Sequence, residues 1–352
     1  DEAGMVGTPK LRQLYAATTQ TGIKTLSVGD PYQLTPVKDR GGMFEQLCND
    51  LPWAQELTEV WRMNDPAERT ASLALRHGGG SARRRAVEWY RRNDRLHIGD
   101  ELAMSQDAFD AYNRSIADGK EALIAADRWE VCDALNIRIH NQNLTEGAPI
   151  VPAARGHHIA AGDIIISRKN SDTIDVYDPV DNTKKVSEQV RNGQRWQVLR
   201  VDPKTNRIAA RRIGDKARTV FEGDYLTQHV HLGYAVTIQA SQGATIDGDC
   251  HEILSRTGDR AKAYVGMTRA KDENHVYIYE KTPGERDHEH AEFNSSVHLA
   301  HRGHSHEAAA ALREILGRDD RPQTILAATA DVDPEHLPAP VLAHKKAYKD
   351  TL

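Results

Sequence analysis

Apolar residues along the chain follow helical spacing in some stretches and strand-like runs in others. In residues 9–19, Leu11, Leu14 and Tyr15 recur with helical spacing, and residues 21–29 form a short apolar run that ends at a Gly-Asp-Pro turn. The first stretch predicts a helix and the second a buried strand. Together they indicate a piece of a parallel α/β sheet.

Further elements of the same kind are expected downstream. Helices are predicted at residues 41–51, at 66–96 with an interruption at Gly78-Gly79-Gly80, and at 128–142. Residues 122–126 form a buried strand directly ahead of the third helix. Strands and helices in alternation are typical of a parallel sheet that is covered by helices.

The pattern changes between residues 150 and 227, where short alternating stretches are separated by turn residues. The stretches at 163–167, 195–199 and 207–210 favour β-strands, and Asn192-Gly193 is typical of a tight turn between strands. We therefore predict a small β-barrel that is inserted into the α/β fold.

The α/β pattern then resumes and ends with a strand at residues 275–279. Beyond residue 282 the chain is rich in His, Ala and Pro, one helix is expected near residues 307–316, and residues 322–352 are interpreted as a linker. The tail histidines lack a carboxylate or cysteine partner at a firm spacing, so we expect no ordered metal site among them. They are His288, His290, His298, His301, His304 and His306.

Composition narrows the class of protein without naming its activity. The 352 residues are 39% hydrophobic and 28% charged, and no run of 18 apolar residues predicts a membrane span. The three cysteines are widely spaced, which suits a reducing cytoplasm. The formal net charge of −5 argues against a protein that binds nucleic acid by bulk charge. It leaves room for a motor that holds a strand in a local groove.

The first two residues are an acidic pair of the kind used in nucleotide hydrolysis. Asp1 is a candidate ligand for Mg²⁺, and Glu2 is a candidate to orient or deprotonate the attacking water. The alternative is an acidic strand end that faces solvent. Because no apolar run precedes the pair, we expect that the sequence is a piece of a longer protein, cut at the edge of this motif.

The segment Gly29-Asp30-Pro31-Tyr32-Gln33-Leu34 changes the balance in favour of nucleotide chemistry. The neutral amide of Gln33 can hydrogen-bond a γ-phosphate and register its loss, and Gly29 and Asp30 are candidates to line the same nucleotide site. The alternative is a simple Asp-Pro turn with a buried leucine.

Two arginines are candidates to stabilise charge on a transferring phosphoryl group. Arg269 lies in the distinctive string Tyr-Val-Gly-Met-Thr-Arg-Ala, and Arg62 lies in a less distinctive segment. A guanidinium in this role is worth roughly 10³–10⁵ in rate. The alternative for Arg62 is a surface ion pair with Glu59.

Residues 236–245 combine small residues with hydroxyl and amide side chains. This composition lets backbone N–H groups approach phosphates closely. Thr237, Ser241 and Gln242 are therefore candidates for DNA contacts, and Gly243 is a candidate for the nucleotide site. The alternative is a tight strand-to-helix turn that needs Gly243 for its backbone.

In this order, the four segments resemble the Walker B, glutamine-sensor, fifth and sixth motifs of the RecD-like branch of superfamily 1 helicases. Residues 231–238, residues 190–196 and the Asn-His-Val-Tyr-Ile strand after Arg269 resemble, more narrowly, the helicase part of TrwC/TraI-type (MobF) conjugative relaxases. The resemblance covers roughly residues 1–282. It implies an α/β fold of two RecA-like P-loop NTPase lobes with an SH3-like barrel in the second.

The resemblance also implies an ATP-dependent enzyme with ATP and Mg²⁺ as cofactors. Its expected partners are single-stranded DNA, along which it moves 5′ to 3′, and other proteins of the conjugation machinery. Three departures stand out: the phosphate-cradling loop G-x-x-x-x-G-K-T is absent, the relaxase nuclease motifs are absent, and Ile238-Gln239-Ala240 replaces a segment where many relatives carry His or Lys. Without that loop, residues 1–352 alone are expected to be inactive.

The expected domains are a remainder of the first lobe, a second lobe in two segments, the inserted barrel and a tail. Their bounds are 1–58, 59–149 with 228–282, 150–227 and 283–352. Two alternatives stay open for the function: a stand-alone RecD-like repair helicase, and a non-catalytic DNA-binding scaffold with a helicase fold.

Overall fold

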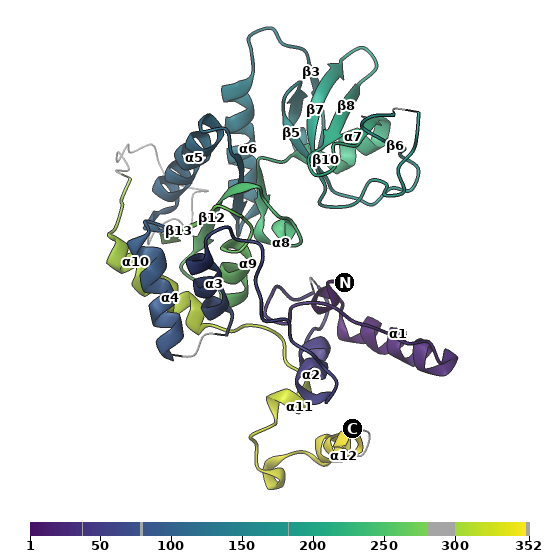
Figure 1. Ribbon diagram of the computed structural model, residues 1–352, viewed down its shortest axis with the longest axis vertical. Helices are drawn as coiled ribbons and strands as arrows, with labels where there is room; N and C mark the ends of the chain where they lie inside the picture. Colours follow the sequence, from purple (N-terminus) through teal and green to yellow (C-terminus); the bar gives the residue numbers. More distant parts are fainter. Residues whose placement is uncertain (37, 78–79, 182, 281–299, 350–352) are drawn as a thin grey trace, which may run out of the picture.

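A parallel sheet forms the centre of the structure, a computed structural model that describes residues 1–36, 38–77, 80–181, 183–280 and 300–349. Its strands are β1 (Leu96–Asp100), β2 (Glu121–Ala126), β11 (Ala235–Thr237), β12 (Gly248–Ser255) and β13 (Glu273–Glu280), in the order β1-β13-β12-β2-β11 (Figure 1). Every neighbouring pair is parallel. The α/β class expected from the sequence is confirmed.

Helices cover both faces of this sheet. Alternate residues of β2 show the division, since Ile124 packs with α5 (Glu101–Ala117) and α6 (Trp129–Asn143), whereas Leu123 packs with the helices of the other face. The helices of that second face are α3 (Pro66–His77), α4 (Gly80–Arg92), α8 (Ile238–Ser241), α9 (Arg260–Gly266) and α10 (Ser305–Gly317). Burial on both faces explains the near-continuous apolar runs of the strands.

The β-rich part folds as an antiparallel six-stranded sheet in the order β10-β5-β7-β8-β9-β6. Its strands are β5 (Ile164–Ser167), β6 (Val176–Tyr177), β7 (Arg195–Asp202), β8 (Arg207–Arg212), β9 (Arg218–Glu222) and β10 (Val230–Leu232). The fully buried Trp196 meets Phe221 edge to face at 5.3 Å between ring centroids. Beside this sheet lie the short pair β3 (Ile150–Pro152) and β4 (His158–Ala160), η2 (Ala154–Gly156) and α7 (Gly223–His229).

Buried polar contacts join this barrel to the parallel sheet. The guanidinium of Arg195 forms an ion pair with Glu121 at 3.0 Å, and the hydroxyl of Tyr234 donates to Asp163 at 2.6 Å. The carboxylate of Asp163 also pairs with His140 of α6 at 2.8 Å. Charge-assisted contacts of this kind fix the orientation of two packed units more tightly than apolar contact alone.

The N-terminal part, residues 1–58, contains η1 (Ala3–Met5), α1 (Thr8–Thr21) and α2 (Met43–Asp50). The strand predicted at 21–29 is wrong, because no strand pairs with this segment among the described residues. Ile23 and Leu26 are 63% and 83% exposed, and extended backbone needs a neighbouring ladder to become a strand.

The C-terminal part departs from the predicted linker. Residues 322–349 contain α11 (Ile325–Ala328), η3 (Pro334–His336) and α12 (Ala339–Lys349), which lie at the opposite end of the molecule from the barrel (Figure 1). The hydroxyl of Tyr348 donates to Asp50 of α2 at 2.8 Å, so the segment is tied to the N-terminal part. Among the tail histidines, His288, His290 and His298 lie outside the described residues.

Two elements of the centre escape the hydrophobic pattern. β12 is buried along its whole length although it contains Asp249, His251 and Glu252. Asp249 pairs with Lys120 at 3.2 Å, and burial lowers the pKa of His251 well below its usual value, so that it is neutral. The end of the helix predicted at 66–96 is wrong as well, because Leu96 begins β1.

No helix in the described ranges has the length and apolar character that a membrane crossing requires.

Candidate functional site

The acidic pair lies where the N-terminal part meets the parallel-sheet domain. Glu2 has left-handed backbone angles, with φ 54°, and one oxygen of its side chain accepts a hydrogen bond from the amide of Gln242 at 3.1 Å. Gly243 follows Gln242, and a Cβ placed there would lie 3.9 Å from the other Glu2 oxygen. The structure therefore brings together the first segment and the 236–245 segment, which are about 240 residues apart.

Asp1 lies at the surface next to this contact. One oxygen of its carboxylate accepts the backbone N–H of Glu2 at 2.9 Å, and the side chain is exposed. It can supply a single oxygen to a cation. In the described ranges, no group of three or more His, Cys, Asp or Glu forms a metal site by itself.

The Gly29–Gln33 loop is held in shape by the carboxylate of Asp30. One oxygen accepts the backbone N–H of Tyr32 at 2.9 Å, and the other accepts the Gln33 amide at 3.2 Å and the Tyr264 hydroxyl at 3.0 Å. Gly29 permits the loop to lie against η1, because a Cβ there would come within 2.9 Å of the Ala3 nitrogen. The side-chain amide of Gln33 thus faces the carboxylate of Asp30, which lies next to α9.

Arg269 is 1% exposed and is fixed from its own turn. Its Nε donates to the carbonyl of Val265 at 2.6 Å, and Nη2 donates to the hydroxyl of Thr268 at 2.9 Å. Burial, and next the charge of Arg62, lower the pKa of Arg269 to about 10. It remains protonated near neutral pH and carries its charge inside the protein.

Arg62 contacts the residue before Arg269, and among the described residues it does not form the surface ion pair with Glu59 that was the alternative interpretation. Its Nη1 donates to the carbonyl of Thr268 at 2.5 Å and its Nε donates to the hydroxyl of Thr245 at 3.2 Å. Burial lowers the pKa of Arg62, and the Glu2 charge opposes that effect. Within the described part of the chain, neither arginine forms an ion pair with a carboxylate within 4.0 Å. A buried and a half-buried cation without such partners favour an anion as their ligand.

The three predicted DNA residues lie around α8. Thr237 caps the helix by accepting the Ala240 N–H at 3.3 Å. Ser241 is buried, and its hydroxyl donates to the carbonyl of Ile238 at 2.8 Å, so its side chain stabilises α8. Gln242 contacts Glu2 and holds its other amide atom, Oε1, buried without a protein partner. The predicted DNA contacts stay predictions.

A cavity of about 100 Å³ lies beside Thr237, between the parallel-sheet domain and the barrel. His231 and Arg168 line it from the barrel side, and Trp129 lines it from the start of α6. The guanidinium of Arg155 lies over the Trp129 ring at 3.8 Å, and that ring is still 50% exposed. An exposed aromatic ring with basic neighbours is typical of a surface on which bases stack.

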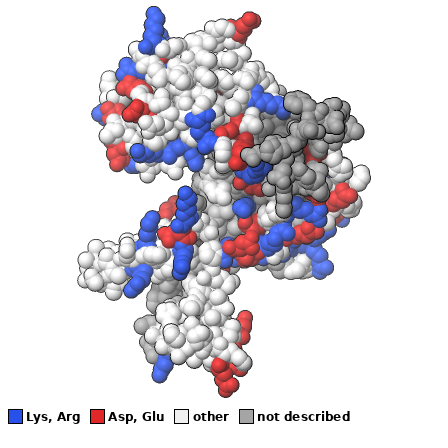
Figure 2. Space-filling model, turned by 180° about the vertical axis from the view of Figure 1, so that it is seen from behind, with Lys and Arg blue, Asp and Glu red and all other residues white. Residues whose placement is uncertain are grey.

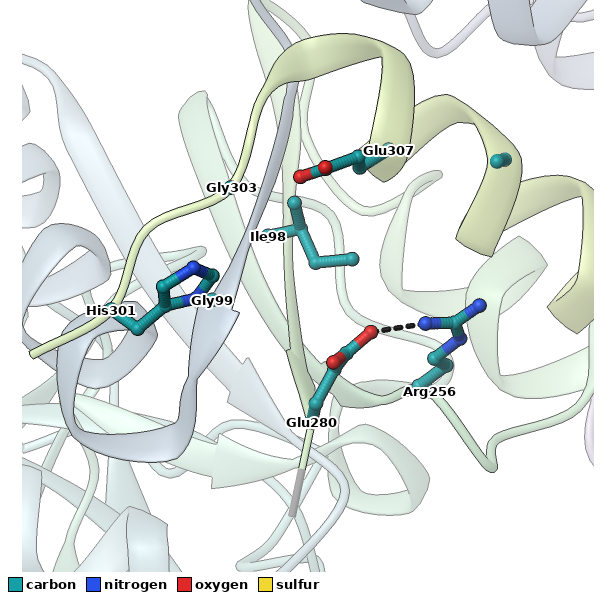
Figure 3. Close-up of a pocket in the computed structure, with 8 residues that line it drawn as sticks. Ile98, Gly99, Arg256, Glu280, His301, Gly303 and Glu307 are labelled. Carbon is teal, nitrogen blue, oxygen red and sulfur yellow. Dashed lines mark hydrogen bonds and ion pairs between the residues drawn. The ribbon is translucent and has the colours of Figure 1, made fainter. Parts of the chain in front are cut away.

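A larger cavity, of about 300 Å³, opens between the ends of β1 and β13 and helix α10 (Figure 3). Its charged side chains are already paired, since Arg256 contacts both Glu280 and Glu314, and Glu307 accepts the backbone N–H of His304 at 2.9 Å. None of the predicted site residues lines this cavity. We therefore assign it no chemistry.

Two contacts that support the site were not found from the sequence. The first is the Tyr264–Asp30 hydrogen bond, for which the only signal is that Tyr264 opens the Arg269 string. The second is a buried chain in which Glu68 accepts from the Asn274 amide at 2.9 Å, and Asn274 accepts the Ala270 N–H at 2.9 Å. This chain fixes the backbone directly after Arg269.

Glu68 is fully buried in this chain and has one oxygen without a protein partner. Burial raises the pKa of Glu68 to about 7, against the lowering effect of the Asn274 hydrogen bond. Near neutral pH the group is therefore partly protonated. Because burying a carboxylate is costly, a glutamate in a sequence is ordinarily expected at the surface. The apolar pattern therefore does not predict that Glu68 is buried.

The residues present fit a nucleoside triphosphate with Mg²⁺. The two guanidinium groups without carboxylate partners suit phosphate oxygens, and Asp1 offers one carboxylate oxygen. Mg²⁺ at nucleotides is usually bound by one or two carboxylates together with phosphate and water. The set on the page is consistent with that pattern.

Two parts of the chain match known domain families. Residues 1–101 match the model of the AAA domain, and residues 151–231 match the Rv2311 SH3-like barrel domain. The uncharacterized protein Rv2311 of Mycobacterium tuberculosis is 51% identical over 96 residues, which are 27% of this chain and 55% of the relative.

Longer relatives are known as well. The conjugal transfer protein TraA of Agrobacterium fabrum is 30% identical over 286 residues, 79% of this chain and 24% of TraA, and the probable TraA of Sinorhizobium fredii matches similarly. The Pif1 helicase of Candida albicans matches in structure with a TM-score of 0.48 and 17% identity, over 80% of this chain and 72% of that chain. The chain spans about a quarter of the length of its TraA relatives and about half of Rv2311. On these sequence matches, the chain is similar over 79% of its length to conjugal transfer proteins named TraA, and its first 101 residues match an AAA domain.

Proposed function

We propose that this chain provides the helicase part of a protein that couples ATP hydrolysis to 5′ to 3′ movement along single-stranded DNA during conjugative transfer. The observation that carries the proposal is that Glu2 contacts Gln242, while Arg62 contacts Thr245 and the carbonyl of Thr268 directly before Arg269, at one junction between two parts of the chain. A site that is shared by two units changes when the units move. Hydrolysis and motion can therefore be coupled through it.

The proposed roles follow from the contacts. Glu2 orients the attacking water, and Arg62 and Arg269 stabilise the charge that develops on the phosphoryl group. Gln33, which is tied to Asp30, reports whether a γ-phosphate is present, and Gly243 lets backbone lie close to the nucleotide. Gly29 instead lets the sensor loop pack against η1. When bound, Mg²⁺ supplies charge neutralisation for the phosphate oxygens.

The proposed DNA path follows the cavity beside Thr237. Trp129 offers a face for a base and Arg168 offers charge to the phosphates, whereas the guanidinium of Arg155 is already paired with Asp133 at 2.9 Å. Figure 2 shows acidic and basic side chains interspersed over one face of the molecule, in keeping with the net charge of −5. DNA binding at a local groove fits this surface better than binding by bulk charge.

A non-catalytic DNA-binding scaffold is the second candidate function. The 352 residues contain no G-x-x-x-x-G-K-[ST] loop, whose backbone and lysine cradle the phosphates in this class of enzyme. For this reason we propose that residues 1–352 by themselves do not hydrolyse ATP. We further propose a cytoplasmic location and contacts with other proteins of the conjugation machinery.

Binding of single-stranded DNA by residues 1–352 tests the proposed path. Fluorescence polarisation with a labelled oligothymidine of about 15 nucleotides should show affinity that falls with salt. Trp129→Ala should weaken binding about tenfold, since base stacking is worth about 1–3 kcal/mol. The control is Trp53→Ala, another exposed tryptophan, in the N-terminal part. Equal binding by wild type and Trp129→Ala would reject this path.

A further inference from the structure

Residues 318–324 cross from the parallel-sheet domain to the N-terminal part after α10 ends (Figure 1). α10 itself is built into the sheet domain, since Leu312, Ile315 and Leu316 are fully buried in the core that contains α4 and α9. α11, at the other end of the crossing segment, follows Thr324, whose hydroxyl contacts the amide oxygen of Gln46 in α2. We call residues 318–324 the strap.

The first end of the strap is fixed to α9 and the turn before it. The Nε of Arg318 donates to the carbonyl of Gly258 at 2.8 Å, and the carbonyl of Arg318 accepts the N–H of Arg260 at 3.0 Å. The side chain of Arg260 pairs with Asp319 at 3.3 Å. Because α9 leads directly to Arg269, this end of the strap moves with the proposed arginine site.

The second end of the strap is fixed to the loop that carries Gln33. The Nη1 of Arg321 donates to the carbonyl of Pro31 at 2.6 Å, and its guanidinium lies 5.0 Å from the centre of the Tyr32 ring. The same group forms an ion pair with Glu45 of α2 at 3.2 Å, and its side chain is only 11% exposed. A guanidinium that meets a carbonyl, a ring and a carboxylate together has little freedom to move.

Asp319 holds Arg321 in this position. Its two oxygens accept from Nε and Nη2 of Arg321 at 2.8 and 2.7 Å, the parallel fork that suits a planar guanidinium. Since Asp319 also pairs with Arg260, one carboxylate joins a cation of the sheet domain to a cation that contacts the Gln33 loop.

Two glycines allow the strap to lie directly on the N-terminal part. A Cβ at Gly41 would lie 2.9 Å from the Pro322 ring, and a Cβ at Gly42 would lie 2.7 Å from the Pro322 carbonyl. Gly42 also has φ +94°, a left-handed angle that favours glycine. The contact is therefore built by backbone shape as well as by charge.

We propose that Arg321 is a positioning residue, and that the strap sets the Gln33 loop against α9 so that the γ-phosphate sensor and the arginine site act together. This inference rests on the proposed ATP hydrolysis for its functional consequence, but the docking itself does not. Arg321 does not touch nucleotide; it acts through Pro31 and Tyr32. Relative movement of the two parts would have to bend or release the strap.

Hydrogen–deuterium exchange of residues 1–352 tests the docking without any nucleotide. Arg321→Ala should accelerate exchange across residues 27–36 about tenfold. The loss of one charge-assisted hydrogen bond typically raises the population of the locally open state by about that factor. Arg313→Ala, an exposed arginine on α10, is the matched control and should leave this segment unchanged. Unchanged exchange at 27–36 in a folded Arg321→Ala protein would overturn the proposal.

Steady-state kinetics of the full-length gene product test the functional consequence. Arg321→Ala should raise the KM for ATP about tenfold with a much smaller change in kcat, and Arg321→Lys, which retains the charge beside Glu45, should recover part of the loss. An unchanged KM for ATP in a folded Arg321→Ala protein would reject the positioning role. If the wild type shows no ATPase activity, the proposed function fails, and the exchange experiment still decides whether the strap docks.

Discussion

The hydroxyl of Tyr264 donates a hydrogen bond to Oδ2 of Asp30 at 3.0 Å, which joins α9 to the loop of the candidate γ-phosphate sensor. Burial raises the pKa of Tyr264 well above its usual value, so the hydroxyl stays protonated and remains a donor. The same Asp30 oxygen accepts from Gln33. One carboxylate oxygen thus links the second half of the chain to the sensor.

Removing that hydroxyl should weaken the junction without unfolding the protein. Tyr264→Phe is expected to lower the free energy of unfolding by about 1 kcal/mol, the usual net value of a hydrogen bond. A double-mutant cycle with Asp30→Asn, measured by urea denaturation, should show a coupling energy of about 0.5–1.5 kcal/mol. Strictly additive effects would mean that the two side chains do not interact in solution.

Glu2→Gln should separate nucleotide binding from turnover in the full-length gene product. The amide retains the shape of the side chain but cannot take a proton from water, so kcat should fall about 10²–10⁴-fold while the Kd for ATP changes little. The contact with Gln242 can persist through the remaining oxygen. Turnover equal to that of the wild type would show that Glu2 is not the group that activates water.

Arg269→Ala should reduce kcat through loss of charge at the transferring phosphoryl group, by about 10³-fold or more. Because its guanidinium also donates to Val265 and Thr268, thermal unfolding must be measured alongside the rate. Arg62→Ala is the paired variant, since Arg62 contacts the carbonyl of Thr268. If a folded Arg269→Ala protein keeps its kcat, the charge role belongs elsewhere.

Ionisation of Glu68 should make stability fall as pH rises. The folded-state pKa of Glu68 is raised to about 7 from 4.5, so the folded protein binds the proton more tightly than the unfolded chain does. Its contribution is therefore fully present below about pH 4.5 and is lost as pH rises through 7, by about 3 kcal/mol in all.

Glu68→Gln keeps an acceptor for Asn274 and removes the ionisation. Urea denaturation at pH 5 and pH 8 should show a smaller loss of stability between the two pH values than in the wild type. Glu146→Gln, at an exposed position, should behave like the wild type. An equal loss in wild type and Glu68→Gln would contradict the assignment of a raised pKa.

Much of the fold follows from local apolar spacing. α1, β2, α6 and β13 were predicted because each carries a periodic or continuous apolar pattern, which burial against a sheet requires. β12 was not predicted, since its buried Asp249 and His251 depend on partners from other elements. The partners that stabilise buried polar side chains come from distant parts of the chain, and a single sequence does not reveal them.

The candidate site was predictable where its chemistry lies in short strings. The short sequence motifs around Glu2, Gln33 and Arg269 identify the candidate side chains. They do not predict that Tyr264 hydrogen-bonds Asp30 or that Arg62 contacts Thr268. The segment 21–29 shows the opposite error, an apolar run that forms no strand because no ladder partner lies beside it in the described residues. Pairing depends on neighbours in space.

Unwinding by the full-length gene product tests the central claim most directly. Two partial duplexes of identical sequence should be compared with ATP and Mg²⁺, one with a 5′ single-stranded overhang and one with a 3′ overhang. We predict strand separation of the 5′-tailed substrate, abolished by Glu2→Gln, and little of the 3′-tailed one. Preferential unwinding of the 3′-tailed duplex would contradict the proposed direction, and failure on both would favour the scaffold.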